Sequence, residues 1–394
     1  IYFLDLIQYR ELSNKIANFW GTIQASLFPW LEEELLPLTN QHRQLVSILE
    51  LIRIEDFIPW NCQWMGRPLA SRKAIARAFV AKCIYNLPTT RKLHQDLQTD
   101  VNLRRICGWE SRKDIPSEST LSRAFKEFAE AALPQKAHEA LIKISYEDEV
   151  IGHLSRDSTA IEGREKPQYE GNSIDSKMRS KKKRRAGRPK KGEKVEPKEK
   201  TRIQKQAEGM TLEEMIKDLP IRCDKGSKRN AKGHTVSWNG YKLHLDTADN
   251  GIPISAILTS ASVHDSQVAI PLAAMSATRV INFYDLMDAA YDVKEITEYL
   301  VGLNHVPIID ANPRRNLDLQ QNLKAESKAR RVLNWKPAEA IRYNQRSSAE
   351  RSNARLKDEF GARNLRVKGS KKVFCHLMIG VLVLSADQLL RLIT

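Results

Sequence analysis

Four residues near the C-terminal end of the chain carry side chains that could hold a polyanion beside a metal ion. Tyr343, Arg346, Glu350 and Lys357, here called the C-terminal stripe, stand at offsets of 0, 3, 7 and 14. On an α-helix, which turns by about 100° per residue, they fall at roughly 0°, 300°, 340° and 320°, within one narrow sector. A core-facing sector should be apolar, whereas this one combines two cations, a carboxylate and a phenol.

An exposed helix would explain part of the same pattern. Arg346 and Glu350 are an i,i+4 pair, and exposed helices often carry such pairs, each contributing about 0.2–0.5 kcal/mol. For any single member of the stripe, a solvated surface is the simpler interpretation. All four residues at this spacing, with acidic residues upstream, favour a functional site.

The charge of the chain indicates a polyanionic partner. It has 64 Lys and Arg against 48 Asp and Glu, a net charge of +16, which favours nucleic acid over a membrane surface. The segment 177–200 holds 13 basic and 3 acidic residues and so contributes +10 of that total. Like-charge repulsion and the lack of apolar residues predict disorder in the free protein, and phosphate binding that weakens as salt rises.

Within this basic segment, Gly187-Arg188-Pro189 resembles the AT-hook, an extended arm that lies in the minor groove. Ala186 stands where that motif has an arginine, so nonspecific binding to the DNA backbone is the expectation. The residues expected to make these contacts are Arg184, Arg185, Arg188 and Lys190.

Acidic residues upstream of the stripe could complete a site for phosphodiester chemistry. Cutting and joining of strands by two metal ions requires carboxylates that converge on Mg²⁺ or Mn²⁺ ions about 3.5–4 Å apart. Asp157 lies in the middle of an apolar segment typical of a strand. The second carboxylate could be Asp285 or Asp288, which both follow a later strand-like segment. Asp265 stands at the start of a helical segment, which favours a role as a helix cap, and Asp292 is interpreted in the same way.

Residues 1–145 show helical periodicity and are predicted to form a helical, DNA-binding domain. One short helix in this region has Leu121, Phe125 and Phe128 on its inner side. Its outer side carries Arg123 and Lys126, as in the second helix of a helix-turn-helix that contacts DNA.

Residues 146–394 are predicted to form a second domain, with a basic, disordered insertion at about 165–222. The elements run as three strands, helix, strand, helix, strand and further helices. This is the order of the ribonuclease-H-like α/β fold, a five-stranded mixed sheet with helices on both faces. The expected strands are 151–161, 240–246, 252–258, 280–284 and 306–310, and the expected helices are 265–277, 293–301, 323–334, 342–359 and one from about 371.

Cysteine use and hydropathy place the chain in the cytoplasm. The five cysteines are scattered without a C-x-x-C pair, which argues against a zinc site and favours reduced thiols. The most apolar stretch, Val373–Leu384, is short and has lysines and Asp387 on its flanks. It is therefore expected to be a buried helix and not a membrane span.

Three separate segments resemble one protein family. The C-terminal stripe matches, at all four positions, the Y-x2-R-x3-E-x6-K element of bacterial insertion-sequence transposases of the DDE type. Arg156–Lys166 is similar to the first catalytic block of that family, and Leu286–Asp292 is similar to its D-x-x-Y block. The resemblance extends from about residue 66 to 390, and the three blocks occur in the family's order.

The resemblance implies that Asp157, Asp288 and Glu350 hold two Mg²⁺ or Mn²⁺ ions, and that the other members of the stripe hold DNA. It implies metal-dependent cleavage at terminal inverted repeats, transfer of the freed strand into target DNA, and a homodimer that pairs two ends. Two alternatives remain open: a DNA-binding derivative that does not cut and serves as a repressor or architectural protein, and a ribonuclease-H-like repair nuclease.

Overall fold

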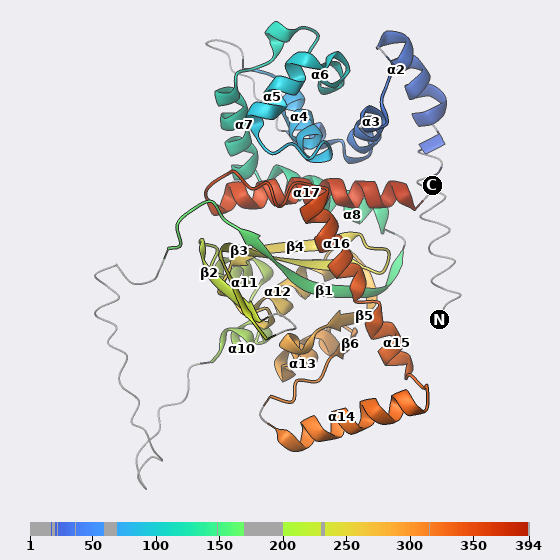
Figure 1. Cartoon of the computed structure of the whole chain (residues 1–394), viewed down its shortest axis with the longest axis vertical. Helices are drawn as coiled ribbons and strands as arrows, with labels where there is room; N and C mark the ends of the chain where they lie inside the picture. The colour runs from blue at the N-terminus through green and yellow to red at the C-terminus, as the bar shows by residue number, and fades with distance from the viewer. Residues whose placement is uncertain are drawn as a thin grey trace, which may run out of the picture.

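The computed structural model of the chain consists of a helical part, a sheet part and a long C-terminal helix that lies between them (Figure 1). The basic residues Arg184, Arg185, Arg188 and Lys190, with their predicted disorder and DNA contacts, lie outside the residues that the structure describes. The described residues are 17, 20–21, 23–35, 37–58, 69–147, 149–168, 200–229, 233–314 and 316–392.

The sheet part is built on a mixed sheet of six strands. Its middle strand, β1 (Val150–Glu162), runs antiparallel to β3 (Thr235–Ala248) and parallel to β5 (Ile281–Met287). Beyond β5 lies β6 (Val306–Ile309), also parallel, while β4 (Pro253–Ser260) pairs with β3 in antiparallel register. The five predicted strands are thus present, and β5 ends three residues later than expected.

The sixth strand, β2 (Asp224–Arg229), was not predicted from the sequence. It pairs with the first half of β3, from Asp224 opposite Gly240 to Arg229 opposite Thr235, because β3 begins five residues before its predicted start. Apart from a glycine, β2 consists of polar and charged residues, so it lacks the alternation of apolar residues by which strands are recognised.

The predicted disordered insertion was wrong in its last part, residues 200–222. This part forms α10 (Arg202–Ala207) and α11 (Leu212–Asp218), and both helices begin with a capping box. Met215 of α11 is buried in a cluster with residues of α12 (Ser266–Ala277). The capping boxes and this apolar contact explain why the segment folds although it adjoins a highly charged stretch.

Helices cover both faces of the sheet, as the fold class predicts (Figure 1). One face is covered by α12, with α13 (Lys294–Gly302) beside it, and the other by α16 (Ser347–Asp358) and α17 (Ser370–Arg391). Successive side chains of β3 point to opposite faces of the sheet and so contact different helices. Leu245 belongs to the cluster that contains α17, whereas Asp246 accepts a hydrogen bond of 2.7 Å from the Ser276 hydroxyl of α12.

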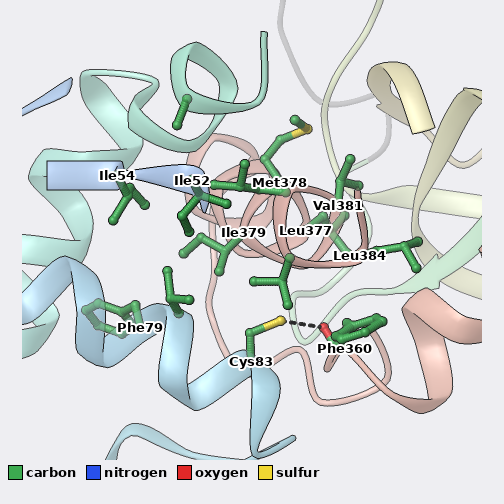
Figure 2. Packing of buried hydrophobic residues seen from close by; sticks show 14 of the residues in the cluster. Ile52, Ile54, Phe79, Cys83, Phe360, Leu377, Met378, Ile379, Val381 and Leu384 are labelled. Atoms are coloured by element: carbon green, nitrogen blue, oxygen red, sulfur yellow. Dashed lines mark hydrogen bonds between the residues drawn. The ribbon is translucent and has the colours of Figure 1, made fainter. Parts of the chain in front are cut away.

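The helical part packs around α17. Figure 2 shows Leu377 and Ile379 of α17 in the same apolar cluster as Phe79 and Cys83 of the helical part and Phe360. This cluster continues into β1, β3 and β4, so one core joins the two parts. The helices of this part are α2 (Phe28–Glu34), α3 (Asn40–Ile52), α4 (Arg72–Ile84), α5 (Thr90–Thr99), α6 (Val101–Cys107), α7 (Glu118–Glu130) and α8 (Leu133–Ser145).

The placement of side chains on α7 follows the prediction. Leu121, Phe125 and Phe128 are buried, while Arg123 and Lys126 are exposed. Lys126 forms an ion pair of 3.7 Å with Glu130 on the same exposed face.

The expected buried helix near the C-terminus is α17. Among the described helices it is the one that is long and apolar enough to cross a membrane, yet most of its apolar residues are buried in the core. Its Asp387 is buried and paired with Arg355 at 2.6 Å and Arg391 at 2.8 Å. The four described cysteines are free and buried, in line with the expectation of reduced thiols.

Candidate active site

Asp157 lies where β1 loses one of its two neighbours. The parallel pairing of β1 with β5 ends at Ser155 opposite Leu286, while its antiparallel pairing with β3 continues to Glu162. The Asp157 side chain is therefore half-buried at the open edge beyond β5. Its Oδ2 accepts a hydrogen bond of 3.0 Å from Nδ2 of Asn353 on α16.

Asp288 follows the last residue of β5 and so reaches the same end of the sheet, because the carboxyl ends of adjacent parallel strands meet at one edge. Its Oδ1 accepts a hydrogen bond of 2.9 Å from the backbone N–H of Ala290, which starts a short 3₁₀ helix at Ala289–Tyr291. Burial raises the pKa of Asp157, the Ser158 backbone and nearby cations oppose that shift, and the like charge of Asp288 adds to it. The two carboxylates are thus close enough to influence each other.

Asp285, the rival for the second carboxylate, has buried partners of its own. Its side chain is 1% exposed and accepts from Arg156 Nη2 at 3.2 Å and from His305 Nδ1 at 2.8 Å. Arg156 is also bidentate to Asp246, at 2.7 and 2.8 Å. Asp285 therefore belongs to a buried network beneath the sheet end, while Asp288 lies at its edge.

The predictions of two helix caps, at Asp265 and Asp292, have different outcomes. Asp265 holds the N-cap position of α12, yet its carboxylate makes no capping bond and instead pairs with Lys242 Nζ at 3.0 Å. The N-cap of α13 is Val293, and Asp292 instead accepts a hydrogen bond of 2.8 Å from the backbone N–H of Asn312. Both carboxylates have long-range partners, which local spacing does not reveal.

The prediction of a single helix over 342–359 was wrong, and the C-terminal stripe is divided between two helices. The structure has α15 (Ala338–Asn344) and α16, with a break at Gln345–Arg346. At the break the backbone forms i,i+3 bonds, such as Arg346 N–H to Tyr343 O at 3.0 Å and Ala349 N–H to Arg346 O at 3.1 Å. The angles of one continuous helix therefore do not apply across it.

The members of the stripe nevertheless remain neighbours around Arg346. The Arg346 guanidinium lies 5.8 Å from the centre of the Tyr343 ring, and its Nη2 donates to Glu350 Oε1 at 2.8 Å. Burial alone would lower the pKa of Arg346, but the charges of Tyr343, Glu350, Asp157 and Asp288 raise it above its ordinary value. One guanidinium is thus influenced by all three acids that the sequence singled out.

Lys357 lies near the far end of α16 and is half-buried. Burial and the charge of Arg363 lower its pKa, and the carboxylate of Asp157 opposes that shift. Lys357 therefore also faces the region of Asp157.

Glu350 is the most open of the three acids, with a side chain that is 57% exposed. Within the described ranges, no three His, Cys, Asp or Glu side chains are close enough together to hold a metal ion. Asp157 and Asp288 lie at the same edge of the sheet, while Glu350 is engaged with Arg346.

Asn353 was not identified from the sequence. It stands three residues after Glu350, about 4.5 Å further along α16, and contacts Asp157 directly. The buried side of α16, which includes Ala349 and Ser352, holds the helix against β1 and β3. The spacing from Glu350 is the signal that could have drawn attention to Asn353.

Comparison with known proteins identifies the family. The chain matches the family model described as Transposase DDE domain over residues 153–385, more than half of its length, and a second model, Transposase domain (DUF772), over residues 31–127. No curated protein and no solved structure showed a match. The DDE domain implies a ribonuclease-H-like fold, in agreement with the mixed sheet, its two helical faces and the helical region before it. The chain therefore belongs to the transposase DDE-domain family.

Proposed function

We propose that the protein is an insertion-sequence transposase that cuts DNA at transposon ends and joins the freed strand to target DNA. The observation that carries this proposal is the meeting of Asp157 and Asp288 at the ends of two adjacent parallel strands, with Arg346 under the influence of both and of Glu350. Such an edge is where open α/β sheets bind their ligands.

The donor chemistry of this site fits Mg²⁺ or Mn²⁺, which prefer carboxylate oxygens. Asp157 and Asp288 would hold two ions. Burial raises the pKa of Asp157 and the like charge of Asp288 adds to that shift, and a divalent cation would offset both effects. Glu350 would complete the site once its ion pair with Arg346 opens. When bound, such ions supply activation of the attacking oxygen and neutralise charge on the leaving oxygen.

The remaining residues of the stripe would act on the DNA. Arg346, released from Glu350, would turn its planar fork of donors to a phosphate, and Lys357 would offer a point charge. The Tyr343 hydroxyl would bind the backbone beside them. Farther away, Arg123 and Lys126 on α7 and the basic residues Arg184, Arg185, Arg188 and Lys190 would add contacts with phosphates. The active form would be a homodimer that pairs two terminal inverted repeats, in the cytoplasm and without a membrane.

The test is a nicking assay with plasmid DNA that contains the coding region and its genomic flanks. With Mg²⁺ or Mn²⁺, the wild type should nick at the ends, whereas Asp157→Asn, Asp288→Asn and Glu350→Gln should each lose cleavage by at least about 10²-fold. Glu339→Gln, an exposed acid of α15, is the matched control and should cut normally. Equal nicking by all variants would overturn the assignment.

A protein that binds DNA without cutting is the second candidate. The ion pair between Glu350 and Arg346, and the absence of a three-ligand cluster in the described parts of the chain, favour it. It predicts DNA binding by the wild type and by Glu350→Gln, with no metal-dependent nicking by either.

A further inference from the structure

A cavity of about 190 Å³ lies at the joint between the helical part and the C-terminal segment. Figure 2 shows four of its lining residues, Phe79, Cys83, Phe360 and Ile379. The cavity also borders the first residues of α5, the loop between α16 and α17, and the first turns of α17. None of the three acids of the candidate active site belongs to its lining, so it is a separate feature.

The lining of the cavity is strongly cationic. Lys82, Arg366, Lys368 and Lys372 contribute to it, and no Asp or Glu does. The remaining lining residues are apolar or neutral. Four cations around one small cavity repel each other, and an anion bound among them would offset this repulsion.

Lys82 is the most informative of the four. It is only 9% exposed, and within the described parts of the chain its ammonium makes no hydrogen bond and no ion pair. Burial of such a group is costly unless a counter-charge is present. The structure of the protein alone provides none, although Lys82 lines a cavity large enough to hold one.

Two neighbouring groups do not fill that role. His376 Nε2 donates to the Gly361 carbonyl at 3.0 Å, and burial together with the charge of Lys82 lowers its pKa to about 4, so it is neutral at pH 7. The Cys83 thiol donates to the Phe360 carbonyl at 3.3 Å, and burial raises its pKa to about 12, so it supplies no thiolate.

Helix ends add to the positive potential. Thr89 and Thr90, at the N-terminus of the ten-residue helix α5, line the cavity. Lys372 lies in the first turn of α17, which begins without a side-chain cap. The N-terminus of a helix favours anions through its free N–H groups and its dipole.

We propose that this cavity binds a phosphate group, with Lys82 at its base and Arg366, Lys368 and Lys372 around its rim. The phosphate could belong to DNA, since the cavity lies beyond the C-terminal end of α16, about 18 Å long, whose N-terminal half carries Glu350. It could equally belong to a small phosphate compound. Binding of a DNA phosphate in the cavity rests on the proposed function, whereas binding of a small phosphate compound does not.

The first arm of the test titrates the full-length, metal-free protein with inorganic phosphate by calorimetry, against sodium chloride at equal ionic strength. We expect saturable binding that Lys82→Met and Lys372→Met each weaken by at least about tenfold, as for a lost bond to a charged group. Lys371→Met, an exposed neighbour outside the lining, is the matched control and should bind as the wild type does. Thermal unfolding checks that each variant folds.

The second arm measures the affinity for a DNA duplex as salt is varied. If DNA supplies the phosphate, Lys82→Met weakens binding, lowers the slope of log K against log salt by about 0.9, and inorganic phosphate competes. If phosphate binds while DNA affinity is unchanged by Lys82→Met, a small phosphate compound is the ligand. If neither phosphate binding nor DNA affinity depends on Lys82, the proposal is overturned. If the wild type does not nick DNA although phosphate binding or DNA affinity depends on Lys82, the catalytic proposal alone is overturned.

Discussion

Arg346, at the break between α15 and α16, places its Nη2 2.8 Å from Oε1 of Glu350 in the first turn of α16. The same guanidinium is influenced by Asp157 and Asp288. In the metal-free protein a side-chain cation therefore stands among the three acids that are proposed to hold divalent ions. Any such ion must compete with Arg346 for Glu350, so this one side chain links metal binding to DNA contact.

Replacement of Arg346 should affect metal binding and DNA binding in opposite directions. Arg346→Gln frees Glu350, so we expect Mn²⁺ to bind about two- to fivefold more tightly, as the loss of one partly exposed ion pair allows. The affinity for DNA should fall, since a phosphate contact is removed. Calorimetry with Mn²⁺ and a DNA-binding assay measure the two effects. Arg363→Gln, which breaks the exposed pair with Asp358, should leave Mn²⁺ affinity unchanged; weaker Mn²⁺ binding by Arg346→Gln would contradict the idea of competition.

The stability of the metal-free protein should depend on pH through Asp157. Burial raises the pKa of this carboxyl in the folded state, so the folded state holds the proton more tightly than the unfolded state does. The resulting stabilisation is complete below the ordinary pKa of about 3.9 and is lost as the pH rises through the folded-state pKa. Asp157→Asn removes this ionisation and should therefore melt at a higher temperature than the wild type at pH 7 in EDTA.

The advantage of Asp157→Asn should shrink as the pH is lowered towards 4, because the wild-type carboxyl is then protonated in the fold. Glu339→Gln, at an exposed position, should show no such trend. Melting curves at several pH values measure both. An advantage that stays constant with pH would show that the substitution acts through packing and not through ionisation.

Much of the sheet was predictable because strands that are buried on one or both faces have a recognisable pattern of apolar residues. The five expected strands have this pattern, and β2, which has no apolar side chain, does not. The break at Gln345–Arg346 was missed because the local spacing, including the i,i+4 pair of Arg346 and Glu350, fits a single helix. Asp265 does hold the predicted N-cap position, but its pairing with Lys242, 23 residues away in the sequence, could not be read from local spacing.

The network beneath the site offers a test of how the sheet edge is held. Arg156 is 1% exposed and joins the buried carboxylates of Asp246 and Asp285. Arg156→Met leaves both without their main counter-charge, so we expect a loss of about 3–5 kcal/mol in the free energy of unfolding. Urea denaturation measures it, with Arg123→Met on the exposed face of α7 as the control. A loss below about 1 kcal/mol would mean that His305 and Ser276 suffice for the two acids.

The close approach of α16 and α17 at Gly380 should be equally sensitive. A Cβ atom at this position would lie 2.8 Å from Leu356 Cδ1 and 2.9 Å from the Phe360 carbonyl oxygen. Alanine within a helix is normally favoured over glycine by about 0.5–1 kcal/mol. Here we expect Gly380→Ala to lower the free energy of unfolding by about 1–3 kcal/mol, since the backbone oxygen of Phe360 cannot swing aside as a flexible side-chain end could.

Gly302→Ala is the matched control, because a Cβ atom there would meet no atom within 4 Å. It should leave stability unchanged or raise it by about 0.4–1 kcal/mol. Gly380→Ala should also disturb DNA cleavage, because a displaced α16 carries Asn353 away from Asp157 and moves Glu350 with it. Full stability and full cleavage in Gly380→Ala would mean that α16 does not lie against α17 at this point, and the proposed position of Glu350 beside the sheet edge would fail with it.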